Sequence, residues 1–371
     1  MSIGCTFALF LSLLSIHASA FALTSELQNI KAERENFVFA SKIEEIQPTE
    51  PEGHINISGF TTRELTDFAG NKYTLIECEP SGYLIYHDDS GVFVESSLES
   101  PSPYKSYSGV LYYGGPTNYY AEKAGKLIHT LTKEEVSPTT SRTANTFSVQ
   151  MADMLLRQKD LDVLGYIEQG APMKNTFPTS AGDTYVEDYY TIRNLKIKAQ
   201  MGYLDGGYCG YIAGGMAMLY LQVHSGLLII PPSKYLNSAG NQFKGDTFTS
   251  HLASYGSSSS TTASSLSSAL NGYFNENHYI VSASWGLLVS GNTIKNGIAN
   301  DQPMMLGGQY YSDPNNPGGS TGDIMHFILA YGYNNTEFIV HYGWANYNEV
   351  RINNGVLILQ TIDYVKLSIT P

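Results

Sequence analysis

The chain has 371 residues, which is enough for about two domains of ordinary size. Hydrophobic residues make up 42% of it, so it can bury sizeable cores. The formal net charge of -13 at pH 7 argues against nucleic acid or an anionic membrane as its main partner.

The N-terminus is typical of a secretory signal peptide. An apolar stretch at residues 7–16 is followed by HASA, an A-x-A-like cleavage site that ends at Ala20. We therefore predict that residues 1–20 are a signal peptide, that the protein is secreted, and that it has no membrane partner after the signal is removed. The alternative is a buried N-terminal helix, because no Lys or Arg precedes the stretch.

Residues 21–145 are predicted to form a small β-rich region. Within it, residues 71–96 alternate apolar and polar positions around Pro-Ser-Gly and Asp-Asp-Ser-Gly turns, which predicts a β-meander. Cys78 lies on the first of these strands and is expected to be a small buried residue. The polar segment at residues 134–146, rich in Ser and Thr, is the predicted linker.

Residues 146–371 change to a pattern of helices followed by strands, which indicates an α+β domain. Apolar spacing predicts helices at residues 147–164, 210–223 and 257–274. The second helix is apolar on all sides, and its Gly214 and Gly215 are expected to let another backbone pack closely. Strands are expected at residues 278–284, 303–310, 326–333, 337–344 and 355–360.

Cys209 stands where a Gly-rich turn becomes the second helix, and two interpretations fit it. A helix N-terminus favours a thiolate, which would make Cys209 a nucleophile. Free cysteine is also among the most buried residue types, which favours a packing role. The other cysteines are Cys5 and Cys78, and a lone Cys78–Cys209 disulfide would be an unusual staple in a chain this long. An unpaired thiol in an exported protein favours the nucleophile.

Two histidines in the C-terminal part supply a candidate base. His326 begins one apolar strand and His341 lies near the end of the next, with a hairpin at residues 333–335. A hairpin loop with an even number of residues would place both histidines on one face of the sheet. A metal site is the alternative, but only Asp323 and Glu337 lie nearby, and neither has zinc-ligand spacing. We expect no metal and no cofactor.

These motifs together resemble the papain-like cysteine peptidases, and in particular the secreted bacterial streptopain-type enzymes. The resemblance rests on GYCGYIAGGMAMLYLQ, IANDQPMMLGG, GDIMHFILAYGY and FIVHYGW, in that order, and it covers residues 147–371. It implies a papain-like fold, in which the helix that carries a cysteine packs on an antiparallel sheet. A looser likeness at SGYLIYHDDSG implies that residues 21–145 are a pro-region.

The resemblance also implies a role for each site residue. Cys209 matches the nucleophile and His326 the general base. His341 takes the place of the Asn that orients the base, with Asn346 as a less favoured substitute. The oxyanion is expected to be held by the Cys209 amide and by Gln200.

The sequence departs from the family pattern at three positions. Met325 stands where the family has Gly, and His341 occurs in HYGW rather than NWGW. Gln200 lies nine residues before Cys209 (209 − 200 = 9), a longer spacing than in papain. Trp344 is expected to pack over the two histidines or to be an ordinary core aromatic residue.

The resulting hypothesis is a secreted cysteine endopeptidase, a hydrolase made as a zymogen, which cleaves polypeptides through a Cys209 thioester. Its pro-region would be an intramolecular inhibitor. The first alternative is a catalytically silent papain-like binding or adhesion protein. The second is an amidase or transpeptidase that uses the same thiol on cell-wall peptides.

Overall fold

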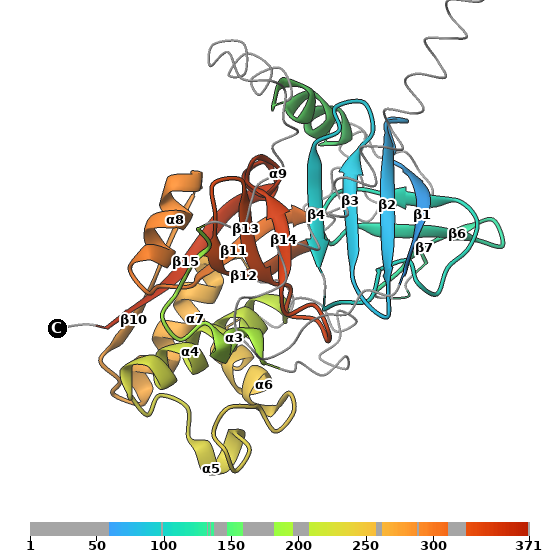
Figure 1. The fold of residues 1–371 in the computed structure, drawn as a ribbon. Helices are drawn as coiled ribbons and strands as arrows, with labels where there is room; N and C mark the ends of the chain where they lie inside the picture. Colours follow the sequence, from blue (N-terminus) through green and yellow to red (C-terminus); the bar gives the residue numbers. More distant parts are fainter. Residues whose placement is uncertain are drawn as a thin grey trace, which may run out of the picture. The chain divides into compact units, whose positions relative to one another are not determined.

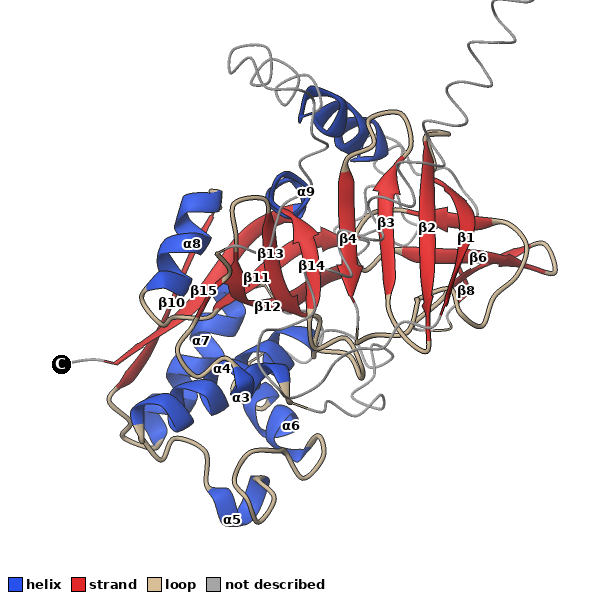
Figure 2. Ribbon diagram, viewed as in Figure 1, coloured by secondary structure: helices blue, strands red, loops and turns tan. Residues whose placement is uncertain are grey.

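The computed structural model describes residues 59–97, 99–131, 133, 135–136, 147–158, 182–195, 208–256, 262–287, 289–310 and 324–369. The predicted signal peptide, Cys5, Gln200 and most of the predicted linker lie outside these residues. Within them, no helix is both long and apolar enough to cross a membrane. Figures 1 and 2 show the arrangement of the elements.

The N-terminal part of the described chain is built from short strands. They are β1 (Gly59–Thr66), β2 (Lys72–Glu79), β3 (Tyr83–His87), β4 (Phe93–Ser97), β5 (Leu111–Tyr113), β6 (Tyr119–Lys123), β7 (Lys126–His129) and β8 (Glu135–Val136). Strands β2, β3 and β4 pair antiparallel in sequence order, which confirms the predicted meander. Cys78 on β2 is a free thiol with 3% exposure, and burial raises its pKa to about 12, as suits a packing residue.

The C-terminal part combines helices with longer strands. After a helix at residues 147–158 come β9 (Thr184–Tyr185), α3 (Tyr190–Arg193), α4 (Cys209–Ser225), α5 (Pro232–Tyr235), α6 (Thr247–Ala253), α7 (Ala263–Glu276), β10 (Val281–Leu287), α8 (Gly291–Ala299), β11 (Met304–Tyr310), β12 (Ile324–Tyr333), β13 (Glu337–His341), β14 (Val350–Asn353), α9 (Asn354–Gln360) and β15 (Thr361–Ile369). The three predicted helices and the first four predicted strands are confirmed in the residues described.

The strand predicted at residues 355–360 is wrong. These residues form α9, because the Asn353 side chain accepts hydrogen bonds from the amides of Gly355 and Val356 and so caps a helix. The strand lies just beyond, in β15, where buried and half-buried residues alternate along Thr361–Ile369. A short apolar run fits either a strand or a buried helix, so the cap decides between them.

All the described strands belong to one sheet. Its order is β10, β15, β11, β12, β13, β14, β4, β3, β2, β1, β5, β6, β7, β8, and β9 pairs with β12 (Figure 2). The pairs are antiparallel except β1 with β5. Strands β14 and β4 join the C-terminal strands to the N-terminal ones through the pairs Arg351–Ser96 and Ile352–Glu95. The fold is therefore mixed α and β, with one large sheet shared by both parts of the chain.

Helix α4 lies between the sheet and a second layer of helices. It packs on β11, β12 and β15 on one side and on α6 and α7 on the other, which explains why it is apolar all round. A Cβ atom on Gly214 would lie 3.2 Å from the Leu270 side chain of α7, so the close neighbour is a side chain and not the expected backbone. The helix ends at Gly226, whose φ of 72° is the left-handed conformation that glycine adopts easily.

Candidate active site

Cys209 is the first residue of α4, is half-buried, and forms no disulfide with a described residue. Tyr208, at the N-cap of this helix, makes no side-chain capping hydrogen bond. The backbone amides of Phe327, Gly210 and Cys209 itself are placed to hydrogen-bond a thiolate and lower its pKa. Burial outweighs them and raises the pKa of Cys209 to about 11. The thiol is therefore protonated at neutral pH in this state of the chain.

His326 lies on β12 with 2% exposure, and its ring is fixed on two sides. Its Nε2 donates a hydrogen bond to the Tyr342 carbonyl oxygen at 2.8 Å, which places the proton of the neutral ring on Nε2. The Trp344 ring stacks on the imidazole, with centroids 4.5 Å apart and planes at 21°. The remaining nitrogen, Nδ1, carries the lone pair from which a base would act.

Helix α4, which begins at Cys209, packs on β12, the strand that carries His326. Phe327, which follows His326 directly, supplies one of the amides at the Cys209 sulfur. Burial lowers the pKa of His326 to about 4, and His129 lowers it further while the Tyr342 hydrogen bond opposes the shift. A thiol and an imidazole with these pKa values are both neutral at pH 7.

His341 does not face His326. Its Nδ1 accepts a hydrogen bond from the Gly343 amide at 2.9 Å, and its Nε2 donates to the Leu195 carbonyl at 3.2 Å. The ring is fully buried, and burial lowers its pKa to about 4. His341 thus holds the turn that carries the Tyr342 carbonyl, and this carbonyl, not the His341 ring, contacts the candidate base.

A β-bulge explains why the expected same-face arrangement is wrong. The register between β12 and β13 shifts at Tyr331, so that His341 lies opposite Leu329. Residues on a strand alternate between faces, and His326 is three residues from Leu329, so the two histidines lie on opposite faces. Without the extra residue, the even loop would have placed them on the same face.

The other predicted site residues lie in different places, and two of them cannot be described. Trp344 stacks on His326, as expected, and Gly343 beside it has a φ of 76° and packs against Ile212, one turn into α4. Asn346 is exposed at a turn position with a φ of 69°. Gln200 and the Met325 side chain lie outside the described residues.

A histidine from the N-terminal strands also lies near the site, and no pattern in the sequence predicted it. His129 ends β7, donates from Nε2 to the Thr117 carbonyl at 2.9 Å, and lies edge-on to Trp344 with ring centroids 6.4 Å apart. The Tyr119 hydroxyl also lies 3.4 Å from the Tyr342 hydroxyl. No local motif marks these residues, because their closeness to the site depends on the pairing of β4 with β14. The N-terminal strands therefore contact both residues that hold His326.

A buried carboxylate lies beneath these contacts. Glu95 on β4 is fully buried and accepts hydrogen bonds from the hydroxyls of Tyr83 at 2.7 Å, Tyr113 at 2.8 Å and Tyr119 at 2.6 Å. Burial raises the pKa of Glu95 to about 7, although the three hydroxyls oppose the shift. The N-terminal strands thus carry a titratable group close to the Tyr342 contact.

No protein-family model matches the chain, and no curated protein matches it at a significant level. Among solved structures, the chain is similar to a mutant fragment of prointerpain A from Prevotella intermedia. The TM-score is 0.39, the sequence identity is 12%, and the match covers 83% of this chain and 98% of that chain. The similarity is weak in both sequence and structure.

Proposed function

We propose that the chain is a secreted, papain-like cysteine peptidase that is made as a latent precursor. The main support for the proposal is the position of Cys209. It begins α4, and its sulfur lies near the backbone of Phe327, on the strand that bears His326. The hydrogen bond from His326 to the Tyr342 carbonyl supports the assignment of His326 as the base, because it leaves the lone pair on Nδ1.

The proposed reaction is acyl transfer. His326 Nδ1 takes the Cys209 proton, and the thiolate attacks a peptide carbonyl to give a tetrahedral oxyanion. The Cys209 amide, and in the proposal Gln200, hold that oxyanion. His326 then protonates the leaving amine as the C–N bond breaks, which leaves a thioester. A water molecule, deprotonated by His326, attacks the thioester and releases the acid and the thiol.

His341 has a positioning role in this proposal. Its two hydrogen bonds require the neutral ring, with the proton on Nε2 and the lone pair on Nδ1. They hold the turn that carries the Tyr342 carbonyl and Trp344. His341 thus acts through Tyr342 rather than on His326 directly.

Latency follows from the N-terminal strands. The neutral thiol and imidazole are the form expected of a site that is not yet active, since a thiolate is the nucleophile. His129 and Tyr119 reach the residues that hold His326, so removal of residues 21–145 would open that side of the site. We propose that this region is the inhibitory pro-region.

The test is labelling of Cys209 by the thiol-directed electrophile E-64 before and after limited proteolysis in the segment 137–146. Cleavage is expected to raise the labelling rate at least about tenfold, because uncovering the thiol lowers its pKa. Cys209→Ala should abolish labelling, and the matched variant Cys78→Ala should leave it unchanged, since Cys78 is buried on β2. Labelling of the cleaved chain no faster than that of a free thiol would refute the peptidase.

A catalytically silent binding protein is the second candidate. The pKa values of about 11 for Cys209 and about 4 for His326 favour it, because they disfavour the thiolate. The same labelling experiment separates it from the peptidase. If the cleaved chain does label, release of fragments from casein or from cell-wall peptides distinguishes an endopeptidase from an amidase.

A further inference from the structure

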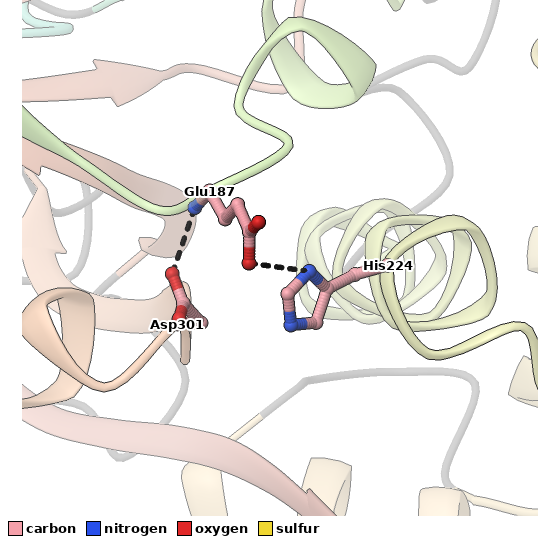
Figure 3. Close-up of side chains that lie close together, drawn as sticks. All are labelled: Glu187, His224 and Asp301. Carbon is pink, nitrogen blue, oxygen red and sulfur yellow. Dashed lines mark hydrogen bonds and ion pairs between the residues drawn. The ribbon is translucent and has the colours of Figure 1, made fainter.

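Three potential metal ligands meet at the C-terminal end of α4, far along the helix from Cys209 (Figure 3). Glu187 follows β9, His224 lies in the last turn of α4, and Asp301 lies between α8 and β11. One ligand atom from each lies within 4.8 Å of the others. Glu187 is exposed and the other two are half-buried, so solvent ions can reach the group.

Contacts from neighbouring groups fix the positions of these side chains. The Glu187 amide donates to Asp301 Oδ1 at 2.7 Å, which aims that carboxylate at the group. His224 Nδ1 lies 3.0 Å from Asp188 Oδ2 and 3.9 Å from Glu187 Oε2. The carboxylates of Glu187 and Asp188 thus lie beside the same imidazole nitrogen of His224. A ligand atom of Asp301 lies within 4.8 Å of those of Glu187 and His224.

A buried tyrosine provides independent evidence for a ligand. Tyr220 is fully buried, yet it lines the same pocket of about 280 Å³ as His224 and Asp301. Its ring stacks on His224, with centroids 5.4 Å apart and planes at 9°. Within the described residues its hydroxyl makes no hydrogen bond of normal geometry, although the backbone of Asp188 lies near it.

The Tyr220 hydroxyl lies near carboxylates of this region. Burial raises the pKa of Tyr220, and the charges of Asp301 and Asp188 raise it further. A buried hydroxyl with an incomplete set of hydrogen bonds is destabilising. A ligand or its bound water in this pocket would complete that set.

We propose that Glu187, His224 and Asp301 bind a divalent transition cation of the Zn²⁺ class. Imidazole nitrogen and carboxylate oxygen together suit Zn²⁺, whereas Ca²⁺ takes six to eight oxygens. The C-terminal end of α4 also favours a cation through the helix dipole. The ligand atoms need only a small closing movement, because tetrahedral Zn²⁺ ligands lie about 3.3 Å apart.

The bound ion would connect three separate segments. Glu187 precedes α3, His224 ends α4, and Asp301 precedes β11, so a single ion would tie two helices to a strand of the sheet. Asp188 and the Tyr220 hydroxyl would complete the surroundings, as a carboxylate beside the ligating imidazole and a donor to metal-bound water. This site is independent of Cys209 and would exist whether or not the chain is a peptidase.

The test is calorimetric titration of Zn²⁺ into the chelator-treated full chain at pH 7.5, with Ca²⁺ in a parallel titration. The expected result is one Zn²⁺ with a Kd of about 1 μM or tighter and no Ca²⁺ binding below roughly 1 mM. A Zn²⁺ Kd weaker than roughly 1 mM overturns the proposal. Zn²⁺ should also raise the melting temperature, since it binds the folded state only.

Three variants identify the ligands. Glu187→Gln, His224→Ala and Asp301→Asn are each expected to weaken Zn²⁺ binding by about 10- to 100-fold. Glu187 is exposed, so its variant keeps the proposal testable even if another variant fails to fold. Tyr220→Phe keeps the stacked ring and should weaken binding several-fold.

The matched control is His278→Asn. His278 is an exposed histidine elsewhere, with a φ of 56° that Asn accepts readily. This variant should bind Zn²⁺ like the unaltered chain. Equal binding by the three ligand variants would show that Zn²⁺ binds elsewhere and would overturn the proposal.

Discussion

The two ends of α4 differ in how far their reactive side chains are exposed to solvent, and this difference determines what each end can bind. The helix dipole favours an anion at Cys209 and a cation at His224, each by about 0.3–1 kcal/mol. At the first end, burial overrides this preference and keeps the Cys209 thiol protonated. At the second end, exposed carboxylates keep contact with water and with the imidazole. The first end therefore depends on being uncovered, whereas the second can react with solvent ions directly.

The largest expected effect is at the buried end. His326→Ala removes the proposed base, so E-64 labelling of the cleaved chain should fall by about 10²- to 10⁴-fold. His224→Ala, at the other end of the same helix, is the control and should leave the labelling rate unchanged. Equal labelling of the His326 variant and the unaltered chain would mean that His326 is not the base.

Burial should also control stability through Glu95. Its folded-state pKa of about 7 lies above the usual value, so its stabilising contribution is complete below about pH 4.5 and is lost as pH rises through 7. Glu95→Gln should remove this loss, which amounts to roughly 3 kcal/mol between pH 5 and pH 8. Urea unfolding of both proteins at the two pH values measures it.

The buried histidines act in the opposite direction over part of this range. His129, His326 and His341 each have a pKa lowered to about 4, so their contribution is present above about pH 6.5 and is lost as pH falls toward 4. Both proteins contain these histidines. Subtracting the unfolding free energy of Glu95→Gln from that of the unaltered chain therefore removes the histidine contribution. Glu122→Gln, on an exposed residue of β6, should show no such difference. A pH dependence shared by all three proteins would contradict the Glu95 assignment.

The smallest effect is expected at the exposed end. His224→Ala should change the unfolding free energy of the metal-free chain by less than about 1 kcal/mol, because the contact between His224 Nδ1 and Asp188 Oδ2 is partly exposed to solvent. Urea unfolding in the presence of chelator measures this value. A loss above roughly 2 kcal/mol would show that this end is as dependent on packing as the Cys209 end.

Much of the fold could be predicted because its signals are local. The meander at residues 71–96 and helix α4 are specified by alternation, turn residues and the terminal Gly226. The run at residues 355–360 was misassigned because its apolar residues fit two structures, although the Asn353 cap was visible in the sequence. The joining of β4 to β14 could not be predicted, because it pairs residues about 255 apart in the chain (351 − 96 = 255).

The candidate residues could be chosen from the sequence where side chains would carry the chemistry. Cys209 and His326 are candidates by residue type and position, and α4 and β12, which carry them, pack together. The group that holds His326 is the Tyr342 carbonyl, and a backbone carbonyl has no signature in the sequence. The face of His341 depends on one bulged residue, Tyr331, which reverses the result of counting along the hairpin.

The short pairing of β4 with β14 has a consequence for the solubility of a processed chain. If residues 21–145 were removed, β14 would become an edge strand, with unpaired backbone groups along Val350–Asn353. Such edges promote aggregation unless charges interrupt them. Arg351, paired with Asp183 at 2.7 Å, lies in the middle of this strand and would interrupt that edge. We therefore expect Arg351 and its carboxylate partners to limit edge-to-edge pairing of such a chain.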